Sequence, residues 1–160
     1  MDELRVVLTI VAVLGSGLIG GVFFAFSTFV MKALATQPPA QGAATMQSIN
    51  VTVRNGWFLS SFLGTAVASA VLVVVSLADL GETDALLQIA GSLLYVVGCF
   101  GVTMAFNVPR NDALAAVEPD SPEGIAEWAR YVPSWTVWNT VRTAASLLAA
   151  IAFTVALVIG

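Results

Sequence analysis

The chain has 160 residues, of which 58% are hydrophobic and only 10% are charged. Soluble domains carry about 25% charged residues. We therefore predict an integral membrane protein. The net charge of −4 and the lack of a basic patch exclude nucleic acid as a partner. The chain has no histidine and one cysteine, Cys99, which excludes ordinary haem ligation, His-rich metal sites, internal disulfides and Ser-His-Asp or Cys-His catalysis.

Four apolar segments are long enough to cross a bilayer, whose ~30 Å core needs about 20 helical residues. The first carries a signal-peptidase-like sequence at residues 33–35, but its apolar run is about twice the usual length of a signal peptide's apolar region. We therefore expect it to be a retained helix. The segments extend from about Leu4 to Leu34, Trp57 to Leu77, Leu86 to Val108 and Ser134 to Ile159. This pattern predicts one all-α domain over residues 1–160, a four-helix transmembrane bundle.

The connections between these segments differ in character. Residues 79–84 form a short acidic turn, so the second and third helices should be antiparallel neighbours. Residues 40–55 place apolar side chains at helical spacing, which predicts a helix that extends the second span below the membrane surface. Between the third and fourth spans, residues 112–117 should be helical, and Ser121 is a typical N-cap for a short amphipathic helix that ends near Arg130. We expect Pro133 to separate that helix from the fourth span.

Basic residues set the expected orientation in the membrane. Arg5 alone flanks one side, whereas the side of the two long connections carries Lys32, Arg54, Arg110 and Arg130. By the positive-inside rule, the long connections are cytoplasmic and both termini lie outside. We expect a multi-pass protein of the cell's inner (plasma) membrane.

Arg142 is the most informative residue, because it is the single charge in the fourth apolar segment. It lies roughly 12 Å along the helix from Ser134. A guanidinium facing lipid at this depth costs several kcal/mol, so Arg142 should face the bundle interior or a wet cavity. Trp135, Trp138 and Asn139 precede it by seven, four and three positions, the spacing of one helical face. Ionisable groups inside a span mark functional sites by default.

Polar and aromatic stripes on the other spans converge at the end that bears the long connections. The first span supplies Phe23, Phe24, Phe26, Ser27 and Phe29, and Lys32 lies at the mouth. The second supplies Asn50, Arg54, Trp57, Ser61 and Gly64, and the third supplies Tyr95, Cys99, Thr103, Asn107 and Asn111. Aromatic walls with a few fixed polar groups are typical of small-molecule sites. The predicted substrate-binding residues are Trp135, Trp138, Arg54, Asn50, Trp57, Phe24, Thr103 and Tyr95.

Structural alternatives exist for the same residues. Arg142 is also compatible with an architectural role, tied to Asn107 or to a helix-end carbonyl. Asn107 and Asn139 are also suited to bridge helices, which amides do in lipid for roughly 0.6–2 kcal/mol. The phenylalanines of the first span equally suit simple packing.

Several motifs, in order along nearly the whole chain, resemble the anthrone oxygenase-like family of small four-helix membrane proteins, whose bacterial members mostly carry a domain of unknown function. They are GVFFAFSTFVM at 21–31, PAQG at 39–42, MQSIN at 46–50, FNVPRNDAL at 106–114, WARY at 128–131 and WTVWNTVRT at 135–143. The NxPxN and WxxWNxxR elements are the most specific of these.

The resemblance implies a fold and an activity. Fungal members oxidise an anthrone to an anthraquinone with O₂ in aromatic polyketide pathways. The motif positions that would form the catalytic site are Arg142, Asn107, Asn139 and Asn111. One departure is Thr140, which stands where many members carry histidine. The implied reaction needs no cofactor and no metal: the anthrone carbanion delocalises into a phenoxide that reacts with O₂ directly, and Arg142 with amide donors would hold the oxyanion.

The catalytic base stays open, because Tyr95 and a carboxylate such as Asp112 both suit that role. The leading hypothesis is a cofactor-independent oxygenase of a lipophilic aromatic or quinone-like molecule, bound near Arg142 within the lipid bilayer. The main alternative is a non-enzymatic accessory subunit or lipophilic-ligand-binding protein, with Arg142 as an internal brace. A transporter is the third candidate; its four helices would need to dimerise, and no span is visibly discontinuous.

Overall fold

The computed structural model describes all residues, 1–160, and confirms the all-α prediction. Its helices are α1 (Glu3–Ala25), η1 (Phe26–Val30), α2 (Met31–Ala35), α3 (Pro39–Thr52), α4 (Gly56–Ser76), η2 (Leu77–Asp79), α5 (Thr83–Leu93), η3 (Leu94–Gly101), η4 (Thr103–Asn107), α6 (Val108–Ala115) and α7 (Pro122–Ile159).

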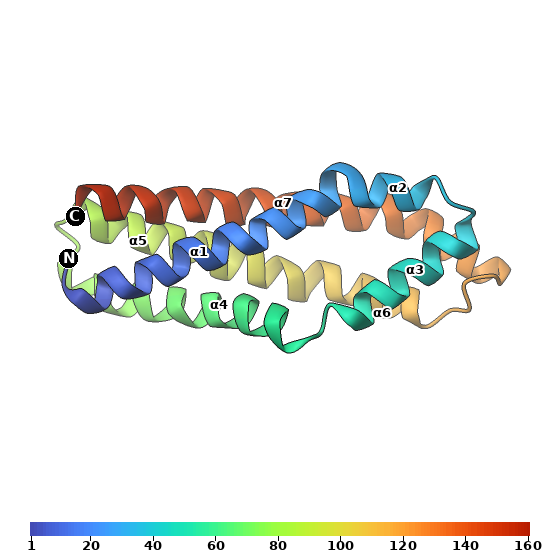
Figure 1. Ribbon diagram of the computed structural model, residues 1–160, viewed down its shortest axis with the longest axis horizontal. Coiled ribbons are helices and arrows are strands. Elements are labelled where there is room, and N and C mark those ends of the chain that lie inside the picture. The colour runs from blue at the N-terminus through green and yellow to red at the C-terminus, as the bar shows by residue number, and fades with distance from the viewer.

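Consecutive helices join into four long rods, each apolar and long enough to cross a membrane: Glu3–Ala35, Gly56–Asp79, Thr83–Ala115 and Pro122–Ile159. Figure 1 shows them as an elongated bundle with both termini at one end and the loops after α2 and α6 at the other. Helix α1 packs against α4 and α7, and α5 packs against the same two helices. The chain therefore runs alternately up and down, and each predicted span lies within one rod.

Helix α3 is not an extension of the second span, so that prediction is wrong. Helix α3 ends at Thr52, and Asn55 begins α4 as an N-cap whose side-chain oxygen accepts a hydrogen bond from the Phe58 backbone N–H at 3.0 Å. Asn is a preferred N-cap because its side chain satisfies a free helix donor. Residues 40–52 instead pack against α2, α6 and α7.

The sequence predicted that Pro133 separates two helices, but the helix continues through it, so that prediction is wrong. Helix α7 begins at the predicted N-cap, Ser121, and continues through Pro133 to Ile159. The Ser134 hydroxyl donates to the Arg130 carbonyl at 2.8 Å in the same turn. Serine hydroxyls commonly supply hydrogen bonds around a proline in a membrane helix. The third rod therefore extends beyond its predicted span to Ala115, and the fourth begins before its predicted span, at Pro122. Only residues 116–121 between them form a loop.

Three π-helical segments, η1, η3 and η4, interrupt the first and third rods. The last ends at Asn107, and α6 follows with Pro109 in its first turn. The Arg110 guanidinium donates to the Phe106 carbonyl at 2.7 Å, on the turn that Pro109 deprives of a donor. A π turn rotates the residues that follow it, and such turns are frequent at functional sites.

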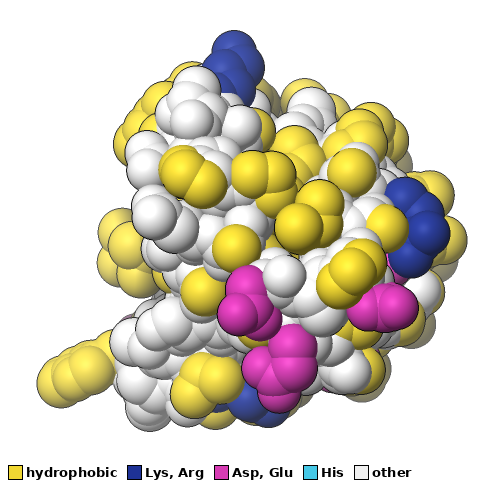
Figure 2. All heavy atoms as spheres, turned by 90° about the vertical axis from the view of Figure 1, so that its right-hand side faces the viewer, with side chains coloured by type: hydrophobic (Ala, Val, Ile, Leu, Met, Phe, Trp, Pro, Cys, Tyr) yellow, Lys and Arg dark blue, Asp and Glu magenta, His cyan; other side chains and the backbone are white.

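The two ends of the bundle are held differently. At the terminal end, Arg5 is 3% exposed and donates to Asp79 and Asp84, each at 2.8 Å, and to Gln88. At the opposite end, an aromatic cluster fills the space between α2, α3, α6 and α7. Figure 2 looks onto that end, where charged side chains of both signs lie among apolar ones.

Candidate active site

A cavity of about 360 Å³ opens in the half of the bundle that bears the long connections. It lies beside the break between α3 and α4, and all four rods contribute to its wall. The aromatic, polar and charged residues of its wall include Phe23, Phe26, Asn50, Arg54, Phe58, Phe62, Phe100, Thr103, Asn111, Asp112, Trp135 and Arg142. Its size and aromatic lining fall within the range of small-molecule sites, about 300–1,000 Å³.

Arg142 lies in the wall of this cavity and is 6% exposed. Its Nε and Nη2 donate to Asn139 Oδ1 at 3.0 and 2.8 Å, and Nη1 donates to Thr103 Oγ1 at 3.2 Å. The guanidinium carbon lies 3.7 Å from the centre of the Phe23 ring and 5.1 Å from that of Trp135. Arginine over an aromatic face gains about 1–2 kcal/mol when desolvated.

No carboxylate compensates this buried charge. The ion pairs of the molecule involve Arg5 and Arg130, not Arg142. A guanidinium has five N–H donors, of which three are used here, so two remain free. Buried charges are normally paired, so this guanidinium without an ion pair is chemically able to bind an anion.

Asn139 fixes the orientation of Arg142. Its side-chain nitrogen donates to the Phe23 carbonyl and to Ser27 Oγ, each at 2.7 Å, which directs Oδ1 toward the guanidinium. Asn139 is completely buried, so its amide has no freedom to turn. This arrangement ties α1 to α7 behind the cavity.

Two further amides present unused donors. Asn111 Oδ1 accepts from Tyr131 Oη and Trp135 Nε1, each at 2.8 Å, and Asn111 lines the cavity. Asn50 also lines it, and its buried Nδ2 has no hydrogen-bond partner. A buried donor without a partner, such as Asn50 Nδ2, is costly, and a ligand oxygen would satisfy it.

Phenylalanines form the remaining walls. Phe58 and Phe62 stack with ring centres 5.9 Å apart, and Phe100 lies 5.5 Å from Phe62. Phe23 meets Phe62 edge to face at 6.5 Å. Flat apolar surfaces thus face the cationic end of the cavity, an arrangement suited to a planar aromatic molecule with one polar edge.

The family model described as "Anthrone oxygenase" matches residues 57–152 of this chain, more than half of its length. The chain belongs to the anthrone oxygenase family. Searches of curated proteins and of solved structures returned no match.

The matched region of this anthrone oxygenase family member includes Asn107, Asn111, Asn139 and Arg142, the four residues predicted to be catalytic. Arg142 and Asn111 line the cavity, and Asn139 supports Arg142 from behind. Asn107 is completely buried off the cavity wall, where its Nδ2 donates to the Trp135 carbonyl at 3.2 Å. Its Oδ1 has no partner.

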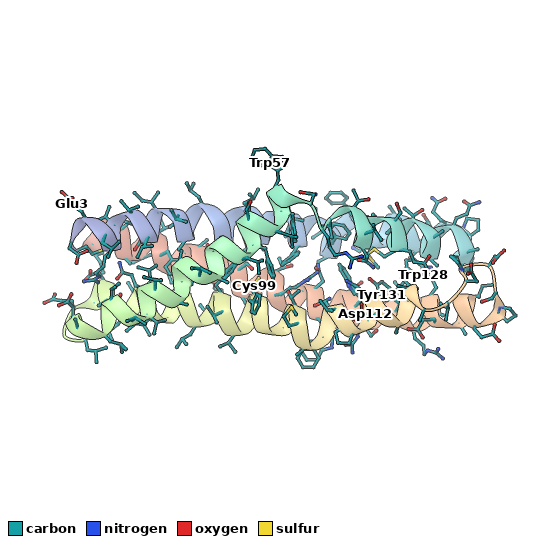
Figure 3. The ribbon with its side chains drawn as sticks, turned by 90° about the horizontal axis from the view of Figure 1, so that it is seen from below. Glu3, Trp57, Cys99, Asp112, Trp128 and Tyr131 are labelled. Atoms are coloured by element: carbon teal, nitrogen blue, oxygen red, sulfur yellow. The ribbon has the colours of Figure 1, made fainter.

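The predicted substrate-binding residues divide into two groups. The residues that line the cavity are Asn50, Arg54, Thr103 and Trp135. Trp57 is 88% exposed and projects away from the bundle (Figure 3), and Phe24 is 52% exposed on the outer surface. Trp138 stacks on Phe106 at 3.6 Å, and Tyr95 is buried with its hydroxyl on the Phe62 carbonyl. None of these four residues lines the cavity, and their part in substrate binding stays a prediction.

Several cavity residues were missed by the sequence argument. Phe58, Phe62 and Phe100 have no polar signal, because they are indistinguishable from packing residues in an apolar span. Asp112 was considered only as one possible base. The molecule contains no group of three or more His, Cys, Asp or Glu side chains arranged to hold a metal ion.

Proposed function

We propose that this protein is a membrane-embedded oxygenase that oxidises a lipophilic aromatic molecule of the anthrone or quinol class with O₂, without a cofactor, in the cavity beside Arg142. The observation that carries the proposal is the buried Arg142 guanidinium in the wall of an aromatic-lined cavity, with neutral partners only and two donors that make no hydrogen bond. Membership of the anthrone oxygenase family supports the same chemistry.

The proposed reaction converts a ring methylene and O₂ into a carbonyl and water. A base takes one proton from the methylene, and the resulting carbanion delocalises its charge onto the ring oxygen as a phenoxide. The carbanion carbon then forms a bond to O₂, and the peroxide takes up a proton. Loss of the second methylene proton and cleavage of the O–O bond release water and leave the quinone carbonyl.

Arg142 would bind the phenoxide oxygen through its two free N–H groups, and the Asn111 and Asn50 amides would donate to the polar edge of the substrate. Fixed donors in a site without water are often the largest contribution to catalysis. Phe58, Phe62 and Phe100 would hold the ring system in the plane that brings its oxygen to Arg142.

Asp112 is the base that the geometry favours over Tyr95. It is the one carboxylate among the lining residues, whereas Tyr95 is completely buried away from the cavity and hydrogen-bonded to Phe62. General-base catalysis contributes about 10²–10⁴-fold. Asp112→Asn should lower the rate within that range, whereas Glu118→Gln, which removes an exposed acid outside the cavity, should not.

The activity is tested by oxygen uptake of purified protein in lipid nanodiscs supplied with an anthrone, with quinone absorbance followed and spontaneous autoxidation subtracted. We expect Arg142→Gln to lower the protein-dependent rate by about 10²–10³-fold. The matched control is Arg130→Gln, which removes an arginine that is 71% exposed and paired with Glu127, and which should keep the wild-type rate. A rate equal to the protein-free blank would instead favour the accessory or ligand-binding role.

The membrane orientation belongs to the same proposal. Both termini lie at the end braced by Arg5, and the cavity lies toward the end with Lys32, Arg54, Arg110 and Arg130. By the positive-inside rule, the cavity would then open toward the cytoplasmic half of the inner membrane.

A further inference from the structure

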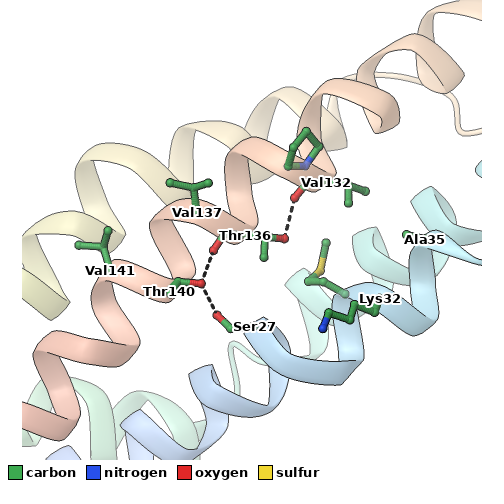
Figure 4. Close-up of a pocket in the computed structure, with 10 residues that line it drawn as sticks. Ser27, Lys32, Ala35, Val132, Thr136, Val137, Thr140 and Val141 are labelled. Atoms are coloured by element: carbon green, nitrogen blue, oxygen red, sulfur yellow. Dashed lines mark hydrogen bonds between the residues drawn. The ribbon is translucent and has the colours of Figure 1, made fainter.

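A second hollow lies on the outer surface between the first rod and α7, and it shares no lining residue with the cavity. It is a groove of about 580 Å³. Its walls come from residues 27–35 on one side and residues 132–141 on the other (Figure 4). Nothing in the proposed reaction uses this groove.

The groove exists because short side chains face each other where larger ones would close the gap. Ser27 and Ala35 lie on the first rod, and Thr136 and Thr140 lie opposite on α7. Val137 and Val141 make its outer edge apolar. From residue 132 to residue 141 the groove extends roughly 14 Å along α7, inside rods that are apolar enough to span a membrane. An acyl chain is the apolar molecule that such a surface meets in a bilayer.

Lys32 supplies the one charge of the groove. It lies three residues before Ala35, the end of the first rod, where a membrane helix approaches the headgroup region, and it forms no ion pair. Figure 4 shows its side chain extended along the first rod over the groove. A free ammonium at the interfacial end of an apolar groove is complementary to a lipid phosphate.

The floor of the groove is connected to Arg142 by hydrogen bonds of defined direction. Because the Thr140 hydroxyl donates to the Thr136 carbonyl, the Ser27 hydroxyl must donate to Thr140, at 2.9 Å. Ser27 in turn accepts from Asn139, whose Oδ1 accepts from Arg142. Substitutions that test the groove should therefore leave Ser27 and Thr140 in place.

We propose that this groove is a binding site for one anionic phospholipid, with an acyl chain between the first rod and α7 and the phosphate on Lys32. The site is independent of the oxygenase reaction, so either assignment can fail without the other. One Lys near an anionic headgroup contributes about five-fold in affinity.

The test is native mass spectrometry of the detergent-solubilised protein with phosphatidylglycerol and phosphatidylcholine of the same acyl chains. The wild type should bind one phosphatidylglycerol about five-fold more tightly than phosphatidylcholine. Lys32→Gln should remove this preference. Val137→Trp, placed at a position that is 60% exposed and tolerant of a larger side chain, should fill the groove and weaken the binding of both lipids.

The control is Arg130→Gln, which removes a basic residue at the same end of the bundle but outside the groove. It should keep the wild-type preference, and unchanged melting temperatures of all three variants show that they fold. The proposal is overturned if Lys32→Gln retains the preference for phosphatidylglycerol, if Arg130→Gln loses as much of it, or if Val137→Trp binds both lipids like the wild type.

Discussion

Replacing Arg142 by glutamine should change the stability of the protein very little, although Arg142 is buried. Removing the guanidinium relieves a burial cost of about 3 kcal/mol for arginine inside a span. Of the three hydrogen bonds to Asn139 and Thr103, glutamine can keep one and loses two, at about 1.5 kcal/mol each for a charged donor. The contact with Phe23 contributes about 1 kcal/mol more. The loss therefore exceeds the gain by only about 1 kcal/mol.

Thermal unfolding in nanodiscs, followed by tryptophan fluorescence, measures the result. We expect Arg142→Gln to shift the melting temperature by less than about 4 °C, since 1 kcal/mol corresponds to about 2–4 °C at this chain length. Arg5→Gln is the contrasting control, because it leaves Asp84, 7% exposed, without its cation. Breaking a buried pair costs about 3–5 kcal/mol, so this variant should melt about 10 °C lower. A comparable loss in Arg142→Gln without ligand would refute the ligand-binding role and make Arg142 a brace.

Substitutions at three further positions distinguish residues that contribute to catalysis from residues that contribute to stability or to neither. In the native protein the Thr103 hydroxyl lies 3.2 Å from Arg142 Nη1. Thr103→Asp should therefore place a carboxylate beside the guanidinium and lower the oxidation rate at least 100-fold. Thr103→Asn, which adds no charge, should lower the rate far less. Asn111→Leu should lower stability by about 2–4 kcal/mol in thermal unfolding, because two buried donors lose their acceptor. Trp57→Ala should leave the oxidation rate unchanged, because its side chain is 88% exposed and outside the cavity.

The four spans and the inward position of Arg142 were predictable from the sequence. Both are determined by the high free-energy cost of placing polar or charged groups in lipid. A bilayer admits only long apolar helices, and a charge within one of them must face the interior. That reasoning located Arg142 correctly on the inner face of the fourth rod. Asn111 and Thr103, which were predicted to share one stripe of the third rod, also line the cavity, whereas Tyr95, Cys99 and Asn107 of the same stripe do not.

The direction in which a side chain points was not predictable from the sequence where a helix breaks or contains a π-helical turn. The stripe through Asn50, Arg54 and Trp57 assumed one continuous helix, but the chain breaks at residues 53–55 and α4 begins anew at Gly56. Asn50 and Arg54 therefore face the cavity while Trp57 points outward. In the third rod, π-helical turns separate Tyr95 in the core from Thr103 at the cavity. Neither a break nor a π turn leaves a clear hydrophobic pattern.

If Arg142 holds an oxyanion, it should change the ionisation of a phenol bound beside it. A naphthol, which keeps the fused ring and the hydroxyl but is not oxidised at a methylene, is titrated in nanodiscs by absorbance. Bound to the wild type, it should ionise at a clearly lower pH than in protein-free nanodiscs, because the guanidinium favours the anion. In Arg142→Gln this shift should disappear. Identical titration curves for the two proteins, with naphthol bound to both, would show that Arg142 does not hold the oxyanion.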